Sequence, residues 1–424
     1  MDLVTTRREF HDEAIETESA DNRRARLDGK LRATLAHAWA SVPRVRRMMD
    51  AAKVTTDDVR TAADLSKLPI TLKDDLGKLQ SEEAPLGGLA ATDVASLKRL
   101  YASPGPIFVP QGAAQDFWRL RWAFAAAGLQ KGEVVLNTLS YNLTPGGFML
   151  DGGLRALGCV VIPAGVGQTD LQVRVSSGLK ATGYTGTPSF LRTLLHRGRE
   201  LNVPLYFQRA FATAEMLPES LRKELQTDFG VRVQQGYVTA DLGTLAYECS
   251  EKAGLHVQPE CILEILDLET GKPAAPGQPG QVVGTTFDPD YPLIRFATGD
   301  VSALLPDADC ACGRTTPRLQ GLLGRVGDAV KVKGLFVRGS QIEGALKAFP
   351  EAAKFQAVIT RADQTDLLTV TVELQPDLAA DAGLPARITE AIHEAIKVRG
   401  EVKLVPAGTL PAGFKRLDDR RVWT

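Results

Sequence analysis

The sequence predicts an α/β protein with a large N-terminal domain and a small α+β domain at the C-terminus. Between residues 91 and 300, short apolar runs alternate with amphipathic stretches, as in domains built on a largely parallel sheet. Residues 325–424 contain strand-like runs and two amphipathic helices that form a group of their own. A chain of 424 residues is long enough for two or three domains at ~100–200 residues each.

The large domain, residues 1–324, is expected to have three parts. Residues of about 20–80 are helical, because apolar side chains recur at helical spacing, and the arginines opposite them are read as a solvated face. Residues of about 91–245 form the α/β part with mixed and parallel sheets, and residues of about 246–324 are β-rich. The small domain, residues 325–424, follows directly.

The expected elements follow from apolar periodicity and flanking turn residues. The expected strands of the large domain are GEVVLNTL, GCVVIP, TGYTGT, VRVQQGY, ILEILDLETG, PGQVVGTTF and PLIRFATGD. The expected helices between them are DFWRLRWAFAAAGL, LQVRVSSGLK, PSFLRTLLHRGREL and PESLRKELQTDFG. In the small domain the strands are KVKGLFV, FQAVITR, LLTVTVELQ and EVKLVP, and the helices are SQIEGALKAF and ARITEAIHEAIK.

Charge and hydropathy exclude several classes of protein. Lys and Arg total 50 against 51 Asp and Glu, which gives no general attraction to nucleic acid or to an anionic membrane. No apolar run approaches the ~20 residues that span a bilayer, and the polar, acidic N-terminus does not resemble a signal peptide. A cytoplasmic location is therefore expected, in which five cysteines do not form a disulfide framework.

Three segments contain residues suited to nucleotide chemistry. Asp241 in YVTADLG comes just after a predicted strand, where ligands bind in α/β sheets and where a carboxylate could hold Mg²⁺. A turn or helix-capping aspartate is the alternative. RFATGD ends with Asp300, and GRVGDAVKVKG (324–334) combines glycines with charges at the expected domain junction.

In this order the segments resemble the adenylate-forming (AMP-binding) superfamily, in particular its phenylacetate-CoA ligase-like branch. The resemblance runs from about residue 30 to the C-terminus and includes SKLPITLKDDL (66–76) and TAEMLPESLR (213–222). It implies a carboxylic acid, ATP and CoA as substrates, Mg²⁺ as cofactor, an acyl-AMP intermediate, and a mobile C-terminal domain.

The resemblance also implies roles for individual residues. Thr213, Ala214 and Glu215 would flank the adenine, and Tyr237 would stack on it. Asp241 would face Mg²⁺ and the phosphates. The family pattern has a threonine immediately before this acid; here Ala240 occupies that position, and Thr239 lies one residue earlier. The ribose would be bound by Asp300 and Arg325, and Asp328 would be the hinge.

The acyl pocket is expected under the carboxyl edge of the sheet. SYNLTPGGF and GYTGTPSFL supply the candidates, and their aromatic side chains are equally compatible with a place in the core. The candidate pocket residues are Tyr141, Phe148, Tyr184, Gly186 and Thr187.

Two stretches depart from the family pattern. Where a Ser/Thr/Gly-rich phosphate loop is expected, RLYASPGPIFVP retains only Ser103 and Gly105, and its prolines have no N–H to donate to phosphate. Near the C-terminus, where a catalytic lysine is expected, Lys415 is the nearest candidate, although one alignment places Gly413 there.

Four polar residues have the character of zinc ligands. Cys249 and His256 are separated by six residues, and Cys310 and Cys312 by one, which suits a tetrahedral structural site. The resemblance strengthens this expectation, because members of this ligase branch often have a similar set of Cys and His residues. The alternative is a pair of reduced surface thiols with an unrelated histidine. Cys261 could replace one ligand but opens an apolar strand, and Cys159 is read as core.

The resulting hypothesis is an AMP-forming acyl-CoA ligase for an aromatic or arylacetic acid, with catalytic Asp241 and Lys415 and a structural zinc ion. A homodimer is possible. The alternatives are a family member that uses a preformed activated acyl group, and a non-catalytic nucleotide-binding, acyl-binding or scaffold protein. The altered phosphate loop favours these alternatives, and the two retained acids favour the ligase.

Overall fold

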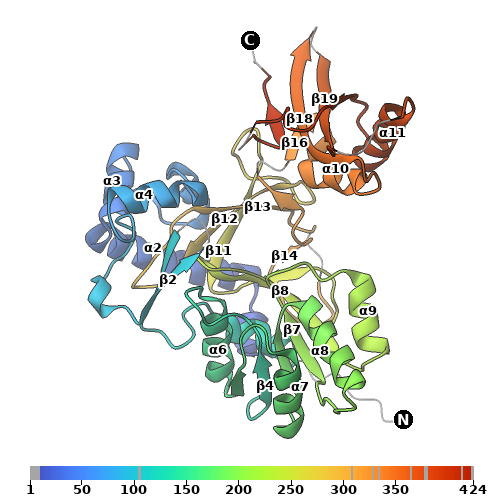
Figure 1. Ribbon diagram of the computed structural model, residues 1–424. Coiled ribbons are helices and arrows are strands. Elements are labelled where there is room, and N and C mark those ends of the chain that lie inside the picture. The colour runs from blue at the N-terminus through green and yellow to red at the C-terminus, as the bar shows by residue number, and fades with distance from the viewer. Residues whose placement is uncertain are drawn as a thin grey trace. The chain divides into compact units, whose positions relative to one another are not determined.

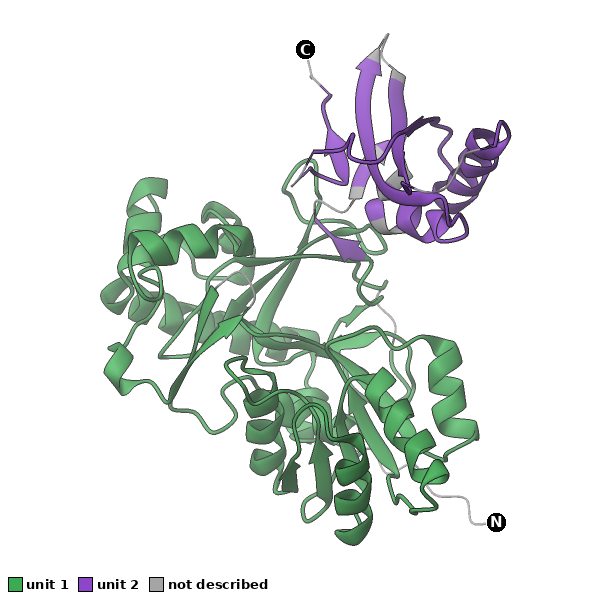
Figure 2. Ribbon diagram, viewed as in Figure 1, with its two compact units in different colours: residues 1–323 green, residues 324–424 purple. Residues whose placement is uncertain are grey.

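The protein consists of two compact units, residues 1–323 and residues 324–424 (Figure 2). The structure is a computed structural model, and each unit is considered separately. It describes residues 10–103, 107–306, 309–326, 329–332, 335–362, 365–376, 381–411 and 414–421.

The first unit contains an eight-stranded sheet of order β14-β10-β9-β8-β7-β6-β4-β5, of which β4, β7, β8 and β14 are labelled in Figure 1. From β5 to β8 each neighbouring pair is parallel, and from β8 to β14 each pair is antiparallel. The strands are β4 (Val134–Asn137), β5 (Val160–Pro163), β6 (Gly183–Gly186), β7 (Arg209–Ala212), β8 (Arg232–Thr239), β9 (Gly243–Tyr247), β10 (Leu255–Val257) and β14 (Arg318–Leu319). Sequence analysis did not predict β7, whose sequence RAFA is short and is not bounded by the turn residues that mark the neighbouring strands.

Helices cover both faces of the parallel strands, because successive strand residues point to opposite faces. Leu136 and Tyr184 pack in a core with α7, α8 and α9, whereas Val135 and Phe211 pack in another with α5 and α6. The helices are α5 (Leu120–Ala126), α6 (Gly146–Leu157), α7 (Thr169–Gly178), α8 (Pro188–Glu200) and α9 (Glu219–Thr227).

A second sheet of the first unit has the order β1-β13-β12-β11. Its strands are β1 (Thr71–Leu72), β11 (Cys261–Leu266), β12 (Gly280–Thr286) and β13 (Phe296–Ser302). Asp300 was expected to follow a strand, but it lies inside β13. The pairing with β12 shifts register between Gln281 and Val283, so the chain bulges opposite Val282, with Gly299 at φ 79°.

Two of the N-terminal helices, α2 and α3, pack on this second sheet through a separate apolar cluster that includes Leu31, Met49 and Ile262. Pro43 opens α3 at a position where a missing N–H costs nothing, and Lys53 ends it in the left-handed conformation. The helices are α1 (Glu13–Glu16), α2 (Ala20–Ser41), α3 (Pro43–Ala52) and α4 (Leu76–Glu82). A hairpin of β2 (Arg99–Ser103) and β3 (Ile107–Gln111) follows them.

The second unit has its own core and a sheet of order β20-β19-β18-β21. The segment KVKGLFV, predicted as one strand, is instead a hairpin of β16 and β17. The elements are β15 (Gly324–Arg325), β16 (Ala329–Val332), β17 (Leu335–Arg338), α10 (Gly339–Leu346), β18 (Ala352–Ala362), β19 (Thr365–Leu374), α11 (Leu384–Ile396), β20 (Glu401–Val405) and β21 (Leu417–Asp419).

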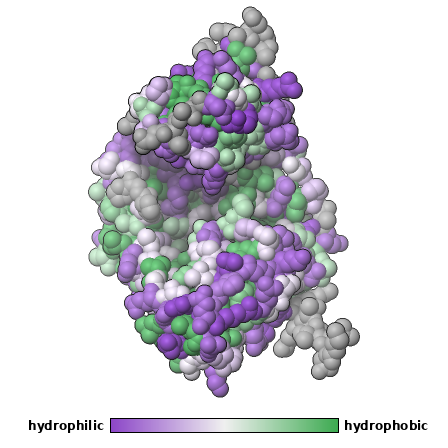
Figure 3. All heavy atoms as spheres, turned by 45° about the vertical axis from the view of Figure 1, so that its right-hand side comes forward, coloured by the Kyte–Doolittle hydropathy of each residue, from purple (hydrophilic) through white to green (hydrophobic). Residues whose placement is uncertain are grey.

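The surface is chemically mixed. On the face shown in Figure 3, hydrophilic and hydrophobic residues are interspersed, as on ordinary protein surfaces. Among the described residues, no helix is both long enough and apolar enough to cross a bilayer.

Candidate functional site

An ion pair joins the two sheets of the first unit. Asp241 lies in the turn between β8 and β9, and Lys73 follows β1 directly. The Lys73 Nζ lies 2.7 Å from Asp241 Oδ2, and the two side chains are only 25 % and 4 % exposed. Burial, and next the Asp241 carboxylate, raise the pKa of Tyr291. Lys73 is in the SKLPITLKDDL segment but was not predicted as a site residue.

A second contact between the same sheets involves the other predicted carboxylate. The Tyr237 hydroxyl, at the end of β8, donates to Asp300 Oδ2 at 2.7 Å. The Asp300 backbone is held by Thr298, whose hydroxyl accepts from the Asp300 N–H at 3.1 Å and donates to the Val282 carbonyl at 3.2 Å. The structure therefore connects the predicted adenine-stacking ring to the predicted ribose-binding acid.

The other predicted adenine contacts follow β7, the strand beside β8. Thr213 is buried and its hydroxyl donates to the Gly236 carbonyl at 3.1 Å, while Ala214 has φ 69°. Glu215 accepts from the Ser189 N–H at 2.7 Å. Because β7 and β8 are parallel, these residues lie at the same carboxyl edge as Tyr237, where α/β sheets bind ligands.

The predicted pocket residues separate into two groups. Tyr141 and Phe148 pack edge to face at 5.0 Å between centroids, and the Tyr141 hydroxyl accepts from Asn137 Nδ2 at 2.7 Å. Tyr101 lies 5.6 Å from the Phe148 ring, and the Arg99 guanidinium lies 4.6 Å from its centroid. Sequence analysis missed Arg99, Tyr101 and Asn137, because nothing in their local pattern separates them from strand residues.

The second group belongs to the core and to a helix start. Tyr184 is fully buried, and its hydroxyl donates to the Thr187 carbonyl at 2.8 Å. Thr187 caps α8 by accepting from the Phe190 N–H, and a Cβ on Gly186 would lie 2.0 Å from the Thr138 hydroxyl. Gly186 is thus required for close packing, and the Tyr184 ring serves the core.

The structure gives little space for a phosphate loop. The antiparallel pairing of β2 and β3 extends to Ser103 and Ile107, so the sequence leaves only residues 104–106 between the strands. The Ser103 hydroxyl donates to the Ile107 carbonyl at 3.3 Å. Gly105, the other residue predicted for this loop, lies outside the described residues.

The remaining predicted residues belong to the second unit. Lys415 is exposed, and its carbonyl accepts from Gln356 Nε2 at 3.1 Å. Arg325 is also exposed. Asp328 lies outside the described residues.

The four predicted metal ligands form one buried cluster. Their ligand atoms all lie within 4.8 Å of one another. Cys249 Sγ is 3.7 Å from Cys310 Sγ, and Cys312 Sγ is 3.5 Å from His256 Nε2. A zinc tetrahedron with Zn–S of about 2.3 Å and Zn–N of about 2.0 Å has edges of about 3.8 Å and about 3.6 Å, so these residues fit the ion.

The second ring nitrogen and the thiols support the same interpretation. His256 Nδ1 is 3.3 Å from the Thr316 hydroxyl, an outer contact of the kind that orients a histidine ligand. A hydrogen bond from Cys249, together with His256, lowers the pKa of Cys312, which favours the thiolate that metals bind. Cys261 lies outside the cluster, in the core.

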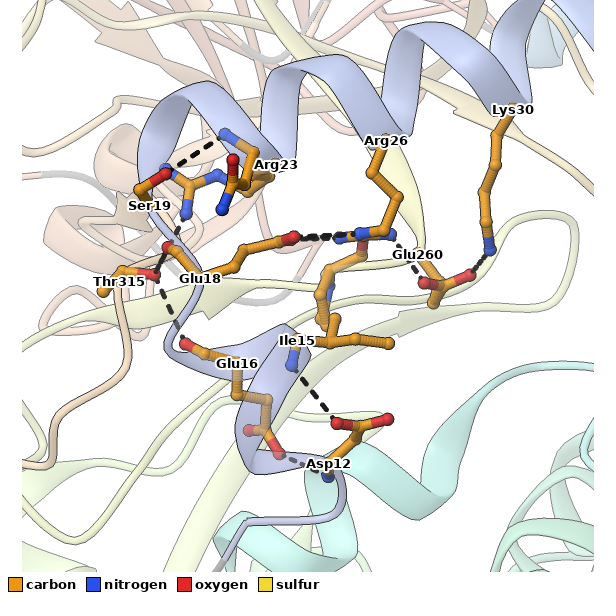
Figure 4. A network of polar contacts seen from close by, with 12 residues as sticks. Asp12, Ile15, Glu16, Glu18, Ser19, Arg23, Arg26, Lys30, Glu260 and Thr315 are labelled. Carbon is orange, nitrogen blue, oxygen red and sulfur yellow. Dashed lines mark hydrogen bonds and ion pairs between the residues drawn. The ribbon is translucent and has the colours of Figure 1, made fainter.

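The loop that contains Cys310 and Cys312 also binds the N-terminal segment (Figure 4). Arg314 forms a buried ion pair with Glu16, which is 0 % exposed. The Thr315 N–H donates to the Glu16 carbonyl at 3.0 Å, and its hydroxyl donates to the Glu18 carbonyl at 2.6 Å. The metal cluster is thus connected to helices that sequence analysis treated separately.

Comparisons with known proteins agree with this arrangement. Residues 334–421 match the model of the AMP-binding enzyme C-terminal domain. Phenylacetate-coenzyme A ligase of Thermus thermophilus is 30 % identical over 430 residues, which cover 94 % of this chain and 95 % of that protein. The enzyme of the same name from Escherichia coli is 29 % identical over 94 % of each chain.

The comparison with solved structures concerns the fold. An open conformation of 2-hydroxyisobutyryl-CoA ligase, solved in complex with 2-HIB-AMP and CoA, has a TM-score of 0.80 at 22 % identity. The match covers 98 % of this chain and 95 % of that one. This chain therefore belongs to the phenylacetate-coenzyme A ligase family, whose members are AMP-forming acyl-CoA ligases.

Proposed function

We propose that this protein joins an aromatic or arylacetic acid to CoA through an acyl-adenylate. In the first step a carboxylate oxygen attacks the α-phosphorus of ATP, and the bond to pyrophosphate breaks. In the second step the CoA sulfur attacks the acyl carbon, its proton is lost, and AMP leaves. The observations that support this most directly are the Lys73–Asp241 ion pair, whose carboxylate is buried, and the Tyr237–Asp300 hydrogen bond. Both contacts join the same two sheets at the edge expected for nucleotide.

Asp300 is the proposed ribose ligand. Its Oδ2 accepts from Tyr237, and a carboxylate in this position can accept from a diol in the same way. Tyr237 is 5 % exposed, so a base that stacks on it would have to displace neighbouring side chains or move the ring. Adenosine binding is therefore expected to exchange the Tyr237 hydrogen bond for bonds to the ribose.

Lys73 is the proposed phosphate-binding cation. With only residues 104–106 between β2 and β3, few backbone N–H groups are available to neutralise phosphate. An ammonium held 2.7 Å from Asp241 in a largely desolvated position would act more strongly than one in bulk water. Lys415 is proposed as a second cation, on the basis of the family resemblance.

Magnesium also fits Asp241. The ammonium of Lys73 contacts Oδ2, and no described residue donates to Oδ1, which leaves a hard oxygen donor for the ion. When bound, Mg²⁺ would supply charge neutralisation at the phosphates. Zinc at the four-residue cluster would be structural, because all four positions would be filled by protein ligands.

The acyl group is assigned to the aromatic cluster of Tyr101, Tyr141 and Phe148. Rings of this kind favour a flat, apolar substituent, which supports an aromatic acid. The Asn137 amide, which donates to the Tyr141 hydroxyl and to the Gly147 carbonyl, fixes one wall. We propose a reducing compartment such as the cytoplasm, because thiolate ligands for zinc and unpaired core cysteines are maintained there.

The test is pyrophosphate release and CoA thioester formation with a panel of arylacetic, benzoic and short aliphatic acids. We expect Asp241→Asn and Lys73→Met each to lower kcat by about 100-fold or more, the scale found when one electrostatic group of a reacting site is removed. Unchanged rates in both variants would remove these residues from the site. Turnover of only the aliphatic acids would refute the aromatic pocket.

One observation favours a second candidate function. The short β2–β3 connection could make adenylation slow while the transfer of a preformed acyl-adenylate to CoA remains possible. Acyl-AMP supplied with CoA distinguishes the two functions. Thioester formation from acyl-AMP without any ATP–pyrophosphate exchange would identify the transferase, and exchange at a comparable rate would identify the full ligase.

A further inference from the structure

The turn that presents Asp241 is held by a two-residue segment that precedes α5. The Trp118 indole Nε1 donates to the Ala240 carbonyl at 2.9 Å, directly before Asp241. The Arg119 guanidinium donates to the Leu242 carbonyl, directly after it. The carbonyls of the two residues that flank Asp241 are thus bound by neighbouring side chains of one segment.

The main chain of this segment reinforces the contact. The Thr244 N–H donates to the Trp118 carbonyl at 2.9 Å. Gly243 approaches so closely that a Cβ there would lie 2.7 Å from the Trp118 carbonyl oxygen, and its φ is 71°. Only glycine satisfies both conditions without strain, so the turn and the Trp118 backbone are fitted to each other.

The segment itself is held by core packing and by hydrogen bonds. Trp118 is 2 % exposed and packs edge to face against Phe117 at 5.0 Å. Asp116 caps the start of α5 by accepting from the Leu120 and Arg121 N–H groups. Arg119 adopts φ 59°, and its carbonyl accepts from Gln258 Nε2 at 3.2 Å. The hydrogen bonds that Trp118 and Arg119 donate to the turn therefore come from a segment whose own position is fixed by packing and by hydrogen bonds.

We propose that Trp118 is a positioning residue for Asp241. Through its single indole N–H it sets the direction in which the Asp241 carboxylate faces Lys73 and an incoming Mg²⁺–ATP. The proposal rests on the proposed role of Asp241. If Trp118 only filled the core, its ring would be required and its N–H would not. A positioning role requires the N–H, so a variant that lacks only the N–H distinguishes the two roles.

Trp118→Phe removes the N–H and keeps a large aromatic ring. Trp122→Phe is the matched control, because Trp122 is in α5, is 3 % exposed, and packs against His11 instead of the turn. We expect Trp118→Phe to lower the kcat of ATP–pyrophosphate exchange about tenfold and to raise the Mg²⁺ concentration needed for half-maximal rate. The KM of the acid and the melting temperature should match those of Trp122→Phe.

Two further arms separate the possible failures. If Asp241→Asn retains full exchange, the proposed function of Asp241 is wrong, and the positioning role is refuted with it. If Asp241→Asn abolishes exchange while Trp118→Phe equals Trp122→Phe, only the positioning role is refuted. In the wild type, the Trp118 indole ¹⁵N–¹H resonance should shift on addition of Mg²⁺–AMP-PNP while that of Trp122 does not. This measurement remains decisive if Trp118→Phe fails to fold, and an unshifted Trp118 resonance would contradict the proposal.

Discussion

Glu16→Gln tests whether the N-terminal segment is an integral part of the first unit. The Glu16 carboxylate is fully buried and bound by four groups: the Arg314 guanidinium, the Tyr247 hydroxyl at 3.2 Å, and the His11 and Asp12 N–H groups at 2.7 and 3.2 Å. The substitution keeps one carbonyl acceptor but removes the negative charge that faces Arg314, which is itself only 4 % exposed. Breaking a buried ion pair on one side costs about 3–5 kcal/mol.

We expect the lower end of that range, about 3 kcal/mol, because the amide oxygen can still accept from the His11 N–H. Urea unfolding followed by tryptophan fluorescence measures it. Three of the four tryptophans, Trp39, Trp118 and Trp122, belong to the first unit, and Trp122 contacts the His11 ring at 4.8 Å. Hydrogen exchange of residues 10–19 should rise in the same variant.

Glu13→Gln is the matched control, since Glu13 is in the same short helix and is exposed. It should change the free energy of unfolding by no more than about 0.5 kcal/mol. Equal stability of the Glu16 and Glu13 variants would refute the reasoning. Removal of the proposed zinc ion by a chelator should also raise hydrogen exchange in residues 10–19, because the Arg314 backbone N lies 3.4 Å from Cys312 Sγ.

Three other substitutions have defined outcomes. Cys310→Ser with Cys312→Ser should release about one zinc per chain and lower the melting temperature, whereas Cys159→Ala should retain the metal; a metal-free wild type by plasma mass spectrometry would end the zinc assignment. Asp288→Asn should stabilise the fold by about 1 kcal/mol or less at pH 7, and less at pH 5. Burial raises the pKa of Asp288, so its ionised form costs stability at neutral pH, and that cost disappears as the carboxylate is protonated at lower pH. The backbone N–H groups of Asp290 and Tyr291, which donate to Asp288 Oδ1, can still donate to the asparagine oxygen. A stability gain of Asp288→Asn that grows towards acid pH would contradict this reasoning. Tyr237→Phe removes the internal donor to Asp300 and should lower the Kd of AMP by about tenfold or more, since hydrogen bonds to charged groups contribute about 1.5–3 kcal/mol. A weaker AMP complex by calorimetry would show that the hydroxyl serves the ligand instead.

The sequence predicted elements best where apolar residues form continuous runs. VVLN and VVIP became β4 and β5, because strands that are covered by helices on both faces are largely apolar throughout. α6 was missed because GGFMLDGGLRAL contains four glycines, which are poor helix formers. The bulge at Asp300 was read as a strand end, because a glycine before an acid is a turn signal in both situations.

The site was predictable where a family motif placed the residues, and unpredictable where it depends on distant pairing. Cys249, His256, Cys310 and Cys312 were identified from residue type and resemblance, and the structure brings them together. Lys73 and Asp241 are 168 residues apart, and only the parallel pairing of β1 with β13 brings Lys73 to the turn after β8. Neither local periodicity nor composition contains that information. The same is true of Trp118, which reads as one aromatic residue in a helical stretch.

Both predicted carboxylates have a partner within the protein, and this constrains how nucleotide binds. Asp241 accepts from Lys73 and Asp300 accepts from Tyr237, so neither acid remains buried without compensation when ligand is absent. A ligand must therefore replace bonds that already exist, and affinity depends on the difference between the old and new partners. In the proposed reaction, ATP would offer Lys73 a more highly charged partner than Asp241, and Asp241 would be released towards Mg²⁺ in the same exchange. A protein with so short a β2–β3 connection can thus still concentrate positive charge at the phosphates, provided that the turn around Asp241 stays fixed while its partner changes.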